Sequence, residues 1–322
     1  MKKIVVFTSG GDSPGMNGAI RAVVRSGIYY GLEVMGSMRG YNGLINNDLI
    51  PMNAHSVSNI IQRGGTILKT ARSKEFMTPE GRQKAYDNLV ANGIDGMVAI
   101  GGDGTYTGAM VFYKEHKIPT IGIPGTIDND LYGTDYTIGF DTAVNTALDA
   151  IDKIRDTADS HDRLFLVEVM GRDTGYIAME VGIAGGAEAI LVPESKTNVQ
   201  EFYDLLENGL RRHKTSFIVV VAEGDELGNA HQIAKYVGEK YPQFDTKVSI
   251  LGHIQRGGKP SARDRVLGSR LGMAAVQALR NGQYNQAAGI VDNQVVYTDF
   301  QDAITKDKKI NRNLFKLVDI LG

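Results

Sequence analysis

Short runs of aliphatic and β-branched residues alternate with longer amphipathic stretches along the 322-residue chain. The runs lack the polar alternation of half-exposed strands, so they are typical of strands buried on both faces of a parallel sheet. The longer stretches have apolar residues at three- and four-residue spacing, which predicts amphipathic helices at 16–30, 142–154 and 262–279. The expected strands are 4–7, 96–100, 120–123, 164–170, 189–192, 217–222 and 248–251.

This alternation predicts an α/β fold with mainly parallel sheets and right-handed crossovers. A chain of this length typically folds into about two domains. We therefore expect two doubly wound, Rossmann-like domains, each with three layers.

Composition excludes several classes of protein. With 35 Lys and Arg against 37 Asp and Glu, no broad basic field is available for nucleic acid. The absence of cysteine excludes disulfides, thiolate metal sites and a cysteine nucleophile. The longest apolar run, 217–222, is far too short to cross a membrane, and no signal-peptide core follows Lys2 and Lys3. We expect a soluble cytoplasmic protein without membrane or nucleic-acid partners.

Glycine is abundant, at 39 residues, and many glycines follow the expected strands. In open α/β sheets, ligands bind beyond the carboxyl ends of the strands, where loops without β-carbons let backbone N–H groups approach an anion. Several such loops at one edge favour a phosphate-rich site, whereas any single pair could simply form a tight turn. The glycines concerned are Gly10, Gly11, Gly101, Gly102, Gly104, Gly125, Gly171, Gly257 and Gly258.

Two of these loops are suited to a nucleotide. The first, 8–17, lacks both Gly-Lys-Ser/Thr and Gly-x-Gly-x-x-Gly, so neither a Walker-type NTPase nor a standard dinucleotide site is supported. The second, 101–105, suits a triphosphate, with Asp103 as an oxygen ligand for Mg²⁺. The alternative for Asp103 is a helix cap.

A third loop, 124–130, and a group of cationic residues could carry the chemistry. Asp128 and Asp130 are suited to general-base catalysis on a hydroxyl, although an Asx-type turn explains their spacing equally well. Arginine side chains match phosphate oxygens in bidentate fashion. For each cation the alternative is a solvated surface residue, and His253 could be a core histidine. The cations are Arg72, Arg163, Arg172, His253 and Arg256.

Together, the motifs at 8–12, 101–105, 124–130, 170–172 and 252–258 resemble the bacterial ATP-dependent 6-phosphofructokinases over nearly the whole chain. The resemblance implies transfer of the γ-phosphoryl group of ATP, with Mg²⁺, to the 1-hydroxyl of fructose 6-phosphate. The products would be fructose 1,6-bisphosphate and ADP, in the committing step of glycolysis.

The resemblance also implies roles for particular residues. Asp128 would be the base, Arg172 would stabilise the phosphoryl group in flight, and Thr126 would complete the catalytic set. Asp103 would hold the metal. The implied nucleotide contacts are Gly11, Tyr41, Arg72, Ser73, Gly102, Asp103, Gly104, Thr105 and Gly108. The implied sugar-phosphate contacts are Thr126, Asp128, Asp130, Arg163, Met170, Gly171, Arg172, Glu223, Lys247, His253 and Arg256.

By the same resemblance, residues 1–139 plus 256–305 form an ATP-binding domain, and 140–255 plus 306–322 form a sugar-phosphate-binding domain. Arg163 would reach into a neighbouring subunit, which implies a homotetramer with shared active sites. ADP and phosphoenolpyruvate would be effectors. The implied effector pocket consists of Arg21, Arg25, Arg155, Gly186, Glu188, Arg212 and Lys214.

The chain departs from the family pattern at four positions. Lys247 replaces a family arginine that grips the 6-phosphate, so the charge is kept but the bidentate fork is lost. Ala54, Asn59 and Ser216 stand where the effector pocket has Arg, Asp and His, which predicts a blunted allosteric response.

The choice of donor and of reaction class leaves alternatives. Pyrophosphate-using relatives carry Asp at the position of Gly104 and Lys at that of Gly125, so the two glycines indicate ATP. NAD kinases and diacylglycerol kinases share the Gly-Gly-Asp-Gly-Thr loop, and a non-catalytic sensor of nucleotide or sugar phosphate is a further alternative.

Overall fold

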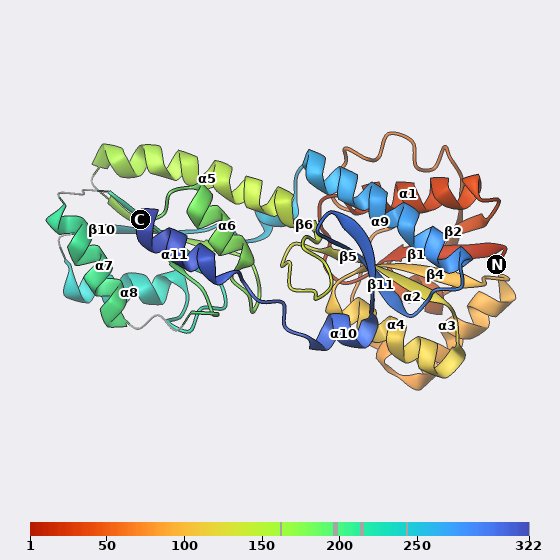
Figure 1. Cartoon of the computed structure of the whole chain (residues 1–322). Helices are drawn as coiled ribbons and strands as arrows, with labels where there is room; N and C mark the ends of the chain where they lie inside the picture. The colour runs from red at the N-terminus through yellow and green to blue at the C-terminus, as the bar shows by residue number, and fades with distance from the viewer. Residues whose placement is uncertain (162, 196–198, 213–215, 243, 322) are drawn as a thin grey trace. The chain divides into compact units, whose positions relative to one another are not determined.

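The structure is a computed structural model of the chain that describes residues 1–161, 163–195, 199–212, 216–242 and 244–321. It divides into two compact units, each with its own sheet (Figure 1). The first unit comprises Met1–Ile127, Leu131–Thr142 and Arg256–Lys308. The second comprises Asp128–Asp130, Ala143–Gln255 and Lys309–Gly322. The bounds differ from the sequence-based expectation chiefly at Asp128–Asp130, which group with the second unit.

The sheet of the first unit has the strand order β12-β11-β5-β4-β1-β2-β3, with β6 paired to β5. The strands from β11 to β2 run parallel, whereas β12 and β3 are antiparallel edge strands. The strands are β1 (Lys3–Thr8), β2 (Glu33–Ser37), β3 (Leu49–Met52), β4 (Gly96–Gly101), β5 (Thr120–Thr126), β6 (Ile138–Gly139), β11 (Gln286–Val291) and β12 (Gln294–Asp299).

Helices cover both faces of this sheet, as Figure 1 shows, with α1 and α9 side by side on one face and α2, α3 and α4 on the other. Two apolar clusters separate the layers, one centred on α1 and α9 and the other on Phe7, Phe76 and Phe112. The helical elements are α1 (Met16–Tyr29), α2 (Tyr41–Ile45), η1 (Glu75–Met77), α3 (Pro79–Ala91), α4 (Asp103–His116), α9 (Ala262–Arg280) and α10 (Phe300–Thr305).

The second unit has a four-stranded parallel sheet in the order β10-β7-β9-β8. Residues of α7 and α8 pack with one face of its strands, while α6 contacts β8 and β9. The elements are α5 (Phe140–His161), β7 (Arg163–Val169), α6 (Tyr176–Ala184), β8 (Ala189–Leu191), α7 (Val199–Arg211), β9 (Phe217–Ala222), α8 (Ala230–Lys240), β10 (Asp245–Ile250), η2 (Gly252–Arg256) and α11 (Arg312–Leu321).

Two sequence-based expectations were wrong in detail, and several strands were missed. The segment 248–251 was expected to be buried on both faces, but β10 is an edge strand that begins earlier, at Asp245, and is half-exposed along its length. Gly125 lies inside β5 rather than in the loop after it, because the strand continues to Thr126. Five short strands, β2, β3, β6, β11 and β12, were not predicted.

A buried carboxylate holds the end of the first unit's sheet. Asp264, near the start of α9, is fully buried, and its Oδ1 accepts the Gly139 N–H at 2.8 Å. Its Oδ2 accepts the Thr142 N–H at 2.9 Å and the Thr142 hydroxyl at 2.5 Å. Burial raises the pKa of Asp264, while the hydrogen bonds from Thr142 and Gly139 oppose the rise. The first turn of α5 is therefore fixed to α9 by one side chain.

We expect Asp264→Ala to lower the free energy of unfolding by about 2–4 kcal/mol, because three buried donors lose their acceptor. Thermal and urea unfolding would measure the loss. The control is Asp302→Ala, which removes an exposed carboxylate of α10 and should change stability by less than about 0.5 kcal/mol. Equal effects of the two substitutions would contradict this account of Asp264.

Candidate active site

The loops that follow β1 and β4 meet at one edge of the first unit's sheet, because these two strands are parallel neighbours. The Ser9 N–H donates to the Ile100 carbonyl at 3.0 Å, and the Thr105 hydroxyl donates back to the Ser9 carbonyl at 3.2 Å. A β-carbon at Gly101 would lie 2.2 Å from Thr105 Oγ1 and 2.5 Å from the Ser9 oxygen. The predicted phosphate loops are thus packed directly against each other.

The second loop opens α4. The N-cap is Gly102, so Asp103 occupies the first helical position and is not the helix cap that was its alternative. Asp103 and Gly104 are exposed, and a β-carbon at Gly104 would meet nothing within 4 Å. A helix N-terminus with bare backbone beside it favours an anion.

A single carboxylate at this position fits a magnesium ion that arrives with a nucleotide. Over the described stretches of the chain, no three His, Cys, Asp or Glu side chains gather as a metal cluster. Mg²⁺ is commonly held by one or two carboxylates together with substrate phosphates. Asp103 suits this mode of binding.

Tyr41, one of the predicted nucleotide contacts, is buried in the first unit. Its ring stacks on Phe76 with centroids 3.9 Å apart, and its hydroxyl donates to the Thr105 carbonyl at 2.6 Å. Burial raises the pKa of Tyr41. A β-carbon at Gly108 would lie 3.0 Å from the ring. Tyr41 thus stabilises the second loop by its hydrogen bond to Thr105 and by packing against Gly108.

Two further predicted nucleotide contacts precede η1. Arg72 is exposed, and the Ser73 hydroxyl accepts the Phe76 N–H at 3.2 Å, so Ser73 orders the turn that carries the Phe76 ring.

Arg256, predicted to bind the sugar phosphate, belongs to the first unit. Its Nη1 donates to the Asp12 carbonyl at 3.2 Å and lies 2.7 Å from where a Gly11 β-carbon would be. A β-carbon at position 11 would force the Arg256 guanidinium group to shift. The structure therefore groups Arg256 with the first glycine loop.

In the second unit, a carboxylate shapes the loop that follows β7. Glu223 Oε1 accepts the Arg172 N–H at 2.6 Å and the Gly171 N–H at 3.3 Å. Arg172 has φ 57°, a left-handed conformation that is rare for a residue with a β-carbon. Glu223, expected to accept sugar hydroxyls, therefore also positions the backbone of the Arg172 loop.

The same loop is joined to Asp128, which is buried with 3% of its surface exposed. The Thr174 hydroxyl contacts the carbonyls of Gly171 at 3.0 Å and Asp128 at 3.2 Å. Asp130 belongs to the same unit. Thr126 precedes this segment as the last residue of β5, and its carbonyl accepts the Thr137 hydroxyl at 2.6 Å. Sequence reasoning missed Thr174, because a threonine in a loop carries no distinctive pattern.

A fully buried glutamine joins the turn that contains His253 to the same loop. Gln255 Oε1 accepts the Met170 N–H at 2.9 Å across 85 residues of sequence. His253, in the same turn η2, is exposed and so is not the core histidine that was its alternative. Asp128, Met170–Arg172, Glu223 and His253 therefore gather near the carboxyl ends of the second unit's strands.

Arg163 and Lys247 lie toward the other end of this sheet. Arg163 is the first residue of β7 and Val169 is the last. The Arg172 loop follows Val169, so the length of the strand, about 20 Å, separates Arg163 from this loop. Lys247 is the third residue of β10, whose first residue pairs with Arg163. A hexose phosphate is too short to bridge this distance, so one chain alone does not bring all the predicted sugar-phosphate residues together.

The predicted effector residues divide between the units. Arg21 and Arg25 lie on α1 of the first unit, whereas Arg155, Gly186, Glu188 and Arg212 belong to the second. Lys214 lies outside the described residues.

Residues at the predicted effector positions of the second unit take part in local hydrogen bonds. Arg155 Nη2 donates to the carbonyls of Gly185 and Gly186, at 2.6 and 2.7 Å. The Ser216 hydroxyl bonds the Asp159 carboxylate.

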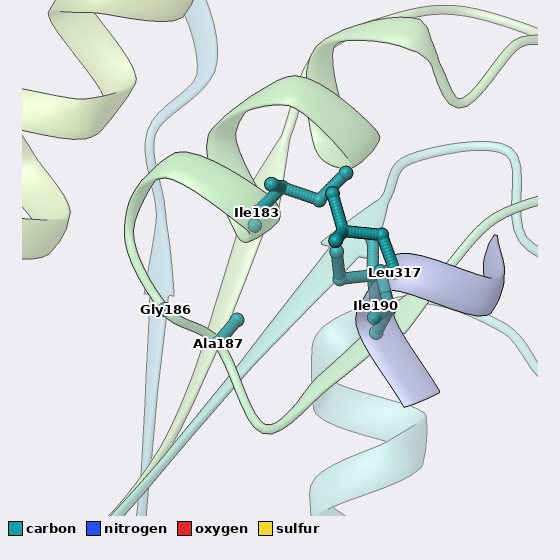
Figure 2. A pocket seen from close by; sticks show the side chains of 7 residues that line it. Ile183, Gly186, Ala187, Ile190 and Leu317 are labelled. Atoms are coloured by element: carbon teal, nitrogen blue, oxygen red, sulfur yellow. The ribbon is translucent and has the colours of Figure 1, made fainter. Parts of the chain in front are cut away.

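A small pocket near Gly186 is apolar rather than cationic. Figure 2 shows side chains from the end of α6, from the following strand and from α11 around it, including Ile183, Ile190 and Leu317. Among the residues that the structure describes, no charged side chain lines it. Its chemistry is unlike that of a phosphate site.

Two doubly wound units with glycine loops at the strand ends define a phosphate-binding α/β protein. The sequence model described as Phosphofructokinase matches residues 3–279, so the chain belongs to the phosphofructokinase family. Family membership does not favour the NAD kinase, diacylglycerol kinase or sensor alternatives.

In the described part of the chain, no helix has the length and apolar character needed to cross a membrane.

Individual relatives support this assignment. The ATP-dependent 6-phosphofructokinase of Cytophaga hutchinsonii is 59% identical over 322 residues, covering 100% of this chain and 98% of that protein. The ATP-dependent 6-phosphofructokinase 1 of Thermus thermophilus is 57% identical, with 100% of both chains covered.

Among solved structures, phosphofructokinase from Saccharomyces cerevisiae has a TM-score of 0.89 at 38% identity, covering 94% of this chain and 45% of the yeast chain. The pyrophosphate-dependent phosphofructokinase of Marinobacter aquaeolei is 23% identical, with a TM-score of 0.85, and covers 97% of this chain and 86% of its own. At this identity, the second structure supports the fold alone.

Two glycines of the second loop offer a matched test. Gly101→Ala should lower the free energy of unfolding by about 1–3 kcal/mol, because its β-carbon would collide with Thr105 and the Ser9 backbone. Gly104→Ala should leave stability unchanged or raise it by up to about 1 kcal/mol, yet weaken binding of a nucleoside triphosphate. Thermal unfolding and calorimetry would measure both effects. Loss of stability in the Gly104 variant would show that this glycine serves packing instead.

Proposed function

We propose that this protein transfers the γ-phosphoryl group of ATP to the 1-hydroxyl of fructose 6-phosphate, giving fructose 1,6-bisphosphate and ADP. The observation that carries the proposal is the 52–59% identity, over the full chain, to bacterial proteins named ATP-dependent 6-phosphofructokinase. This reaction commits sugar to glycolysis, which supports a cytoplasmic location.

The first unit would bind the nucleotide. The backbone of Gly11 and of Gly102–Thr105, with Gly108 behind them, would cradle the phosphates, and Arg72 would supply positive charge. Tyr41 and Ser73 would order this wall through Thr105 and Phe76. Mg²⁺ bound with the nucleotide would be held by Asp103 and would neutralise charge on the phosphates.

The second unit, together with Thr126 and Arg256 of the first, would supply the acceptor side. Asp128 would accept the proton of the sugar 1-hydroxyl, and Asp130 and Thr126 would complete its loop. Arg172 would stabilise the charge of the transferring group, since phosphoryl transfer depends mainly on positioning and electrostatics. Met170, Gly171 and Glu223 would hold the sugar, while His253 and Arg256 would bind its phosphate.

The choice of ATP over pyrophosphate rests mainly on Gly104. The open space beside it accommodates a longer polyphosphate chain. Gly125 supports the same choice for a different reason than expected, because its β-carbon would point at Met16 Cε (2.9 Å) and Ile100 Cγ2 (3.0 Å) within the fold. A lysine there would have to displace these side chains.

The positions of Arg163 and Lys247 support active sites shared between subunits. Along the strand direction, Arg163 lies about 20 Å and Lys247, which pairs with Phe165, about 13 Å from the last residue of β7, so both would contact the 6-phosphate bound by a neighbouring copy. Residues from two copies in one site require an oligomer, and the family resemblance points to a homotetramer.

The same resemblance makes ADP and phosphoenolpyruvate the candidate effectors. Their response would be weakened by Ala54, Asn59 and Ser216. The hydrogen bond from Ser216 to Asp159 supports this, because it places a negative charge beside that position.

A coupled assay with Mg²⁺ and fructose 6-phosphate should show faster turnover with ATP than with pyrophosphate. Asp128→Ser should lower kcat by at least about 10²-fold, the low end for general-base catalysis, and leave fructose 6-phosphate binding largely intact. Wild-type turnover in this variant would remove Asp128 from the mechanism, and faster turnover with pyrophosphate would refute the choice of donor.

Subunit complementation tests the shared site. Asp128→Ser and Arg163→Glu should each be nearly inactive at low fructose 6-phosphate. If each site takes Asp128 from one copy and Arg163 from another, random mixed assembly should restore about a quarter of the sites. Co-refolding equal amounts of the two variants, followed by the coupled assay, would measure this. Activity no higher than the average of the two variants would indicate sites within single chains.

A further inference from the structure

Asp245 lies between the two cations that the proposed function assigns to the 6-phosphate of a neighbouring copy. Its Oδ2 is 2.7 Å from Arg163 Nε, and its Oδ1 is 2.6 Å from Lys247 Nζ. Each carboxylate oxygen therefore holds one cation. The three side chains form one cluster at the start of β7 and β10.

Strand geometry produces this cluster. Asp245 and Arg163 are directly paired in the parallel register of β10 and β7. Asp245 and Lys247 are two residues apart on β10, so their side chains point to the same face. Because β10 is the edge strand of its sheet, the cluster remains open to solvent, with 27%, 48% and 43% of the Arg163, Asp245 and Lys247 side chains exposed.

Asp245 is an anion throughout the neutral range. Hydrogen bonds from Lys247 and Arg163 hold the pKa of its carboxyl below the usual value. The cluster thus carries one net positive charge, where the two cations alone would carry two.

We propose that Asp245 is an internal counter-ion that bridges Arg163 and Lys247 until the sugar phosphate displaces it. Because Asp245 competes with the phosphate for these two cations, it sets the affinity of the site for phosphate. A phosphate group that accepts from both cations would use the same donors, Arg163 Nε–H and Lys247 Nζ–H, that Asp245 uses now. This inference rests on the proposed function, since it assigns the bound anion to fructose 6-phosphate.

Displacement is feasible because ion pairs between exposed side chains are weak and are screened by salt. A phosphate dianion carries more charge than a carboxylate, so it competes effectively for two adjacent cations. Asp245 would lower the affinity for phosphate without preventing binding. It would also keep the two cations from repelling each other when no sugar phosphate is bound.

The test compares Asp245→Asn, Asp245→Glu and the intact protein in the coupled assay. Asp245→Asn should lower the half-saturating fructose 6-phosphate concentration about three- to tenfold, the effect of losing weak ion pairs, while kcat and the KM for ATP stay within about twofold. Asp245→Glu keeps the charge and should remain close to the intact protein.

Asp149→Asn is the matched control. It removes a carboxylate from an exposed ion pair with Lys153 on α5, so the net charge changes equally while the cluster stays intact. The half-saturating concentration should not change. An Asp245→Asn variant with unchanged or weaker sugar-phosphate affinity would overturn the proposal.

Calorimetric titration with inorganic phosphate separates this proposal from the proposed function. Asp245→Asn should bind phosphate about three- to tenfold more tightly than the intact protein, even if neither phosphorylates fructose 6-phosphate. Absence of turnover in the intact protein would refute the proposed function, whereas equal phosphate affinity in the two proteins would refute the role of Asp245.

Discussion

Parallel pairing of β1 with β4, and of β4 with β5, is the constraint on which the rest of the first unit depends. Parallel neighbours end at the same edge, so segments more than 90 residues apart are placed in hydrogen-bonding contact, as Thr105 is with Ser9. These strands are buried on both faces, so a shift of one residue would exchange the side chains packed against one helical layer for those packed against the other, which leaves little freedom in register. The geometry of the loops is therefore fixed by the core of the sheet rather than by the loops themselves.

Around the Arg172 loop of the second unit, polar side chains form hydrogen bonds with backbone groups. Glu223 accepts the N–H groups of the Arg172 loop, Gln255 accepts that of Met170, and Thr174 joins this loop to Asp128. Such bonds fix a left-handed residue, Arg172, in a conformation that its own side chain disfavours. The hydrogen-bonded backbone of this loop therefore positions the Arg172 guanidinium group.

Much of the fold could be predicted from sequence because buried parallel strands, such as 217–222, are continuous apolar runs. The edge strands β3 and β12 were missed, because β3 is only four residues long and contains Pro51, and β12 begins and ends with polar residues. The Asp103 loop and the Asp128 loop carry recognisable motifs. Asp245, Thr174 and Gln255 do not, because their roles depend on partners 46 to 85 residues away that only the folded chain brings near.

The position of Arg163 at one end of β7 and of the Arg172 loop at the other has a mechanical consequence. A strand in the interior of a sheet is stiff along its axis and moves as a unit with its neighbours. Under the proposed sharing of sites, β7 would serve as a rod with one end in its own active site and the other in that of a neighbouring copy. A displacement of β7 along its axis would then change both sites together and would couple the subunits of the proposed oligomer without a separate signalling element.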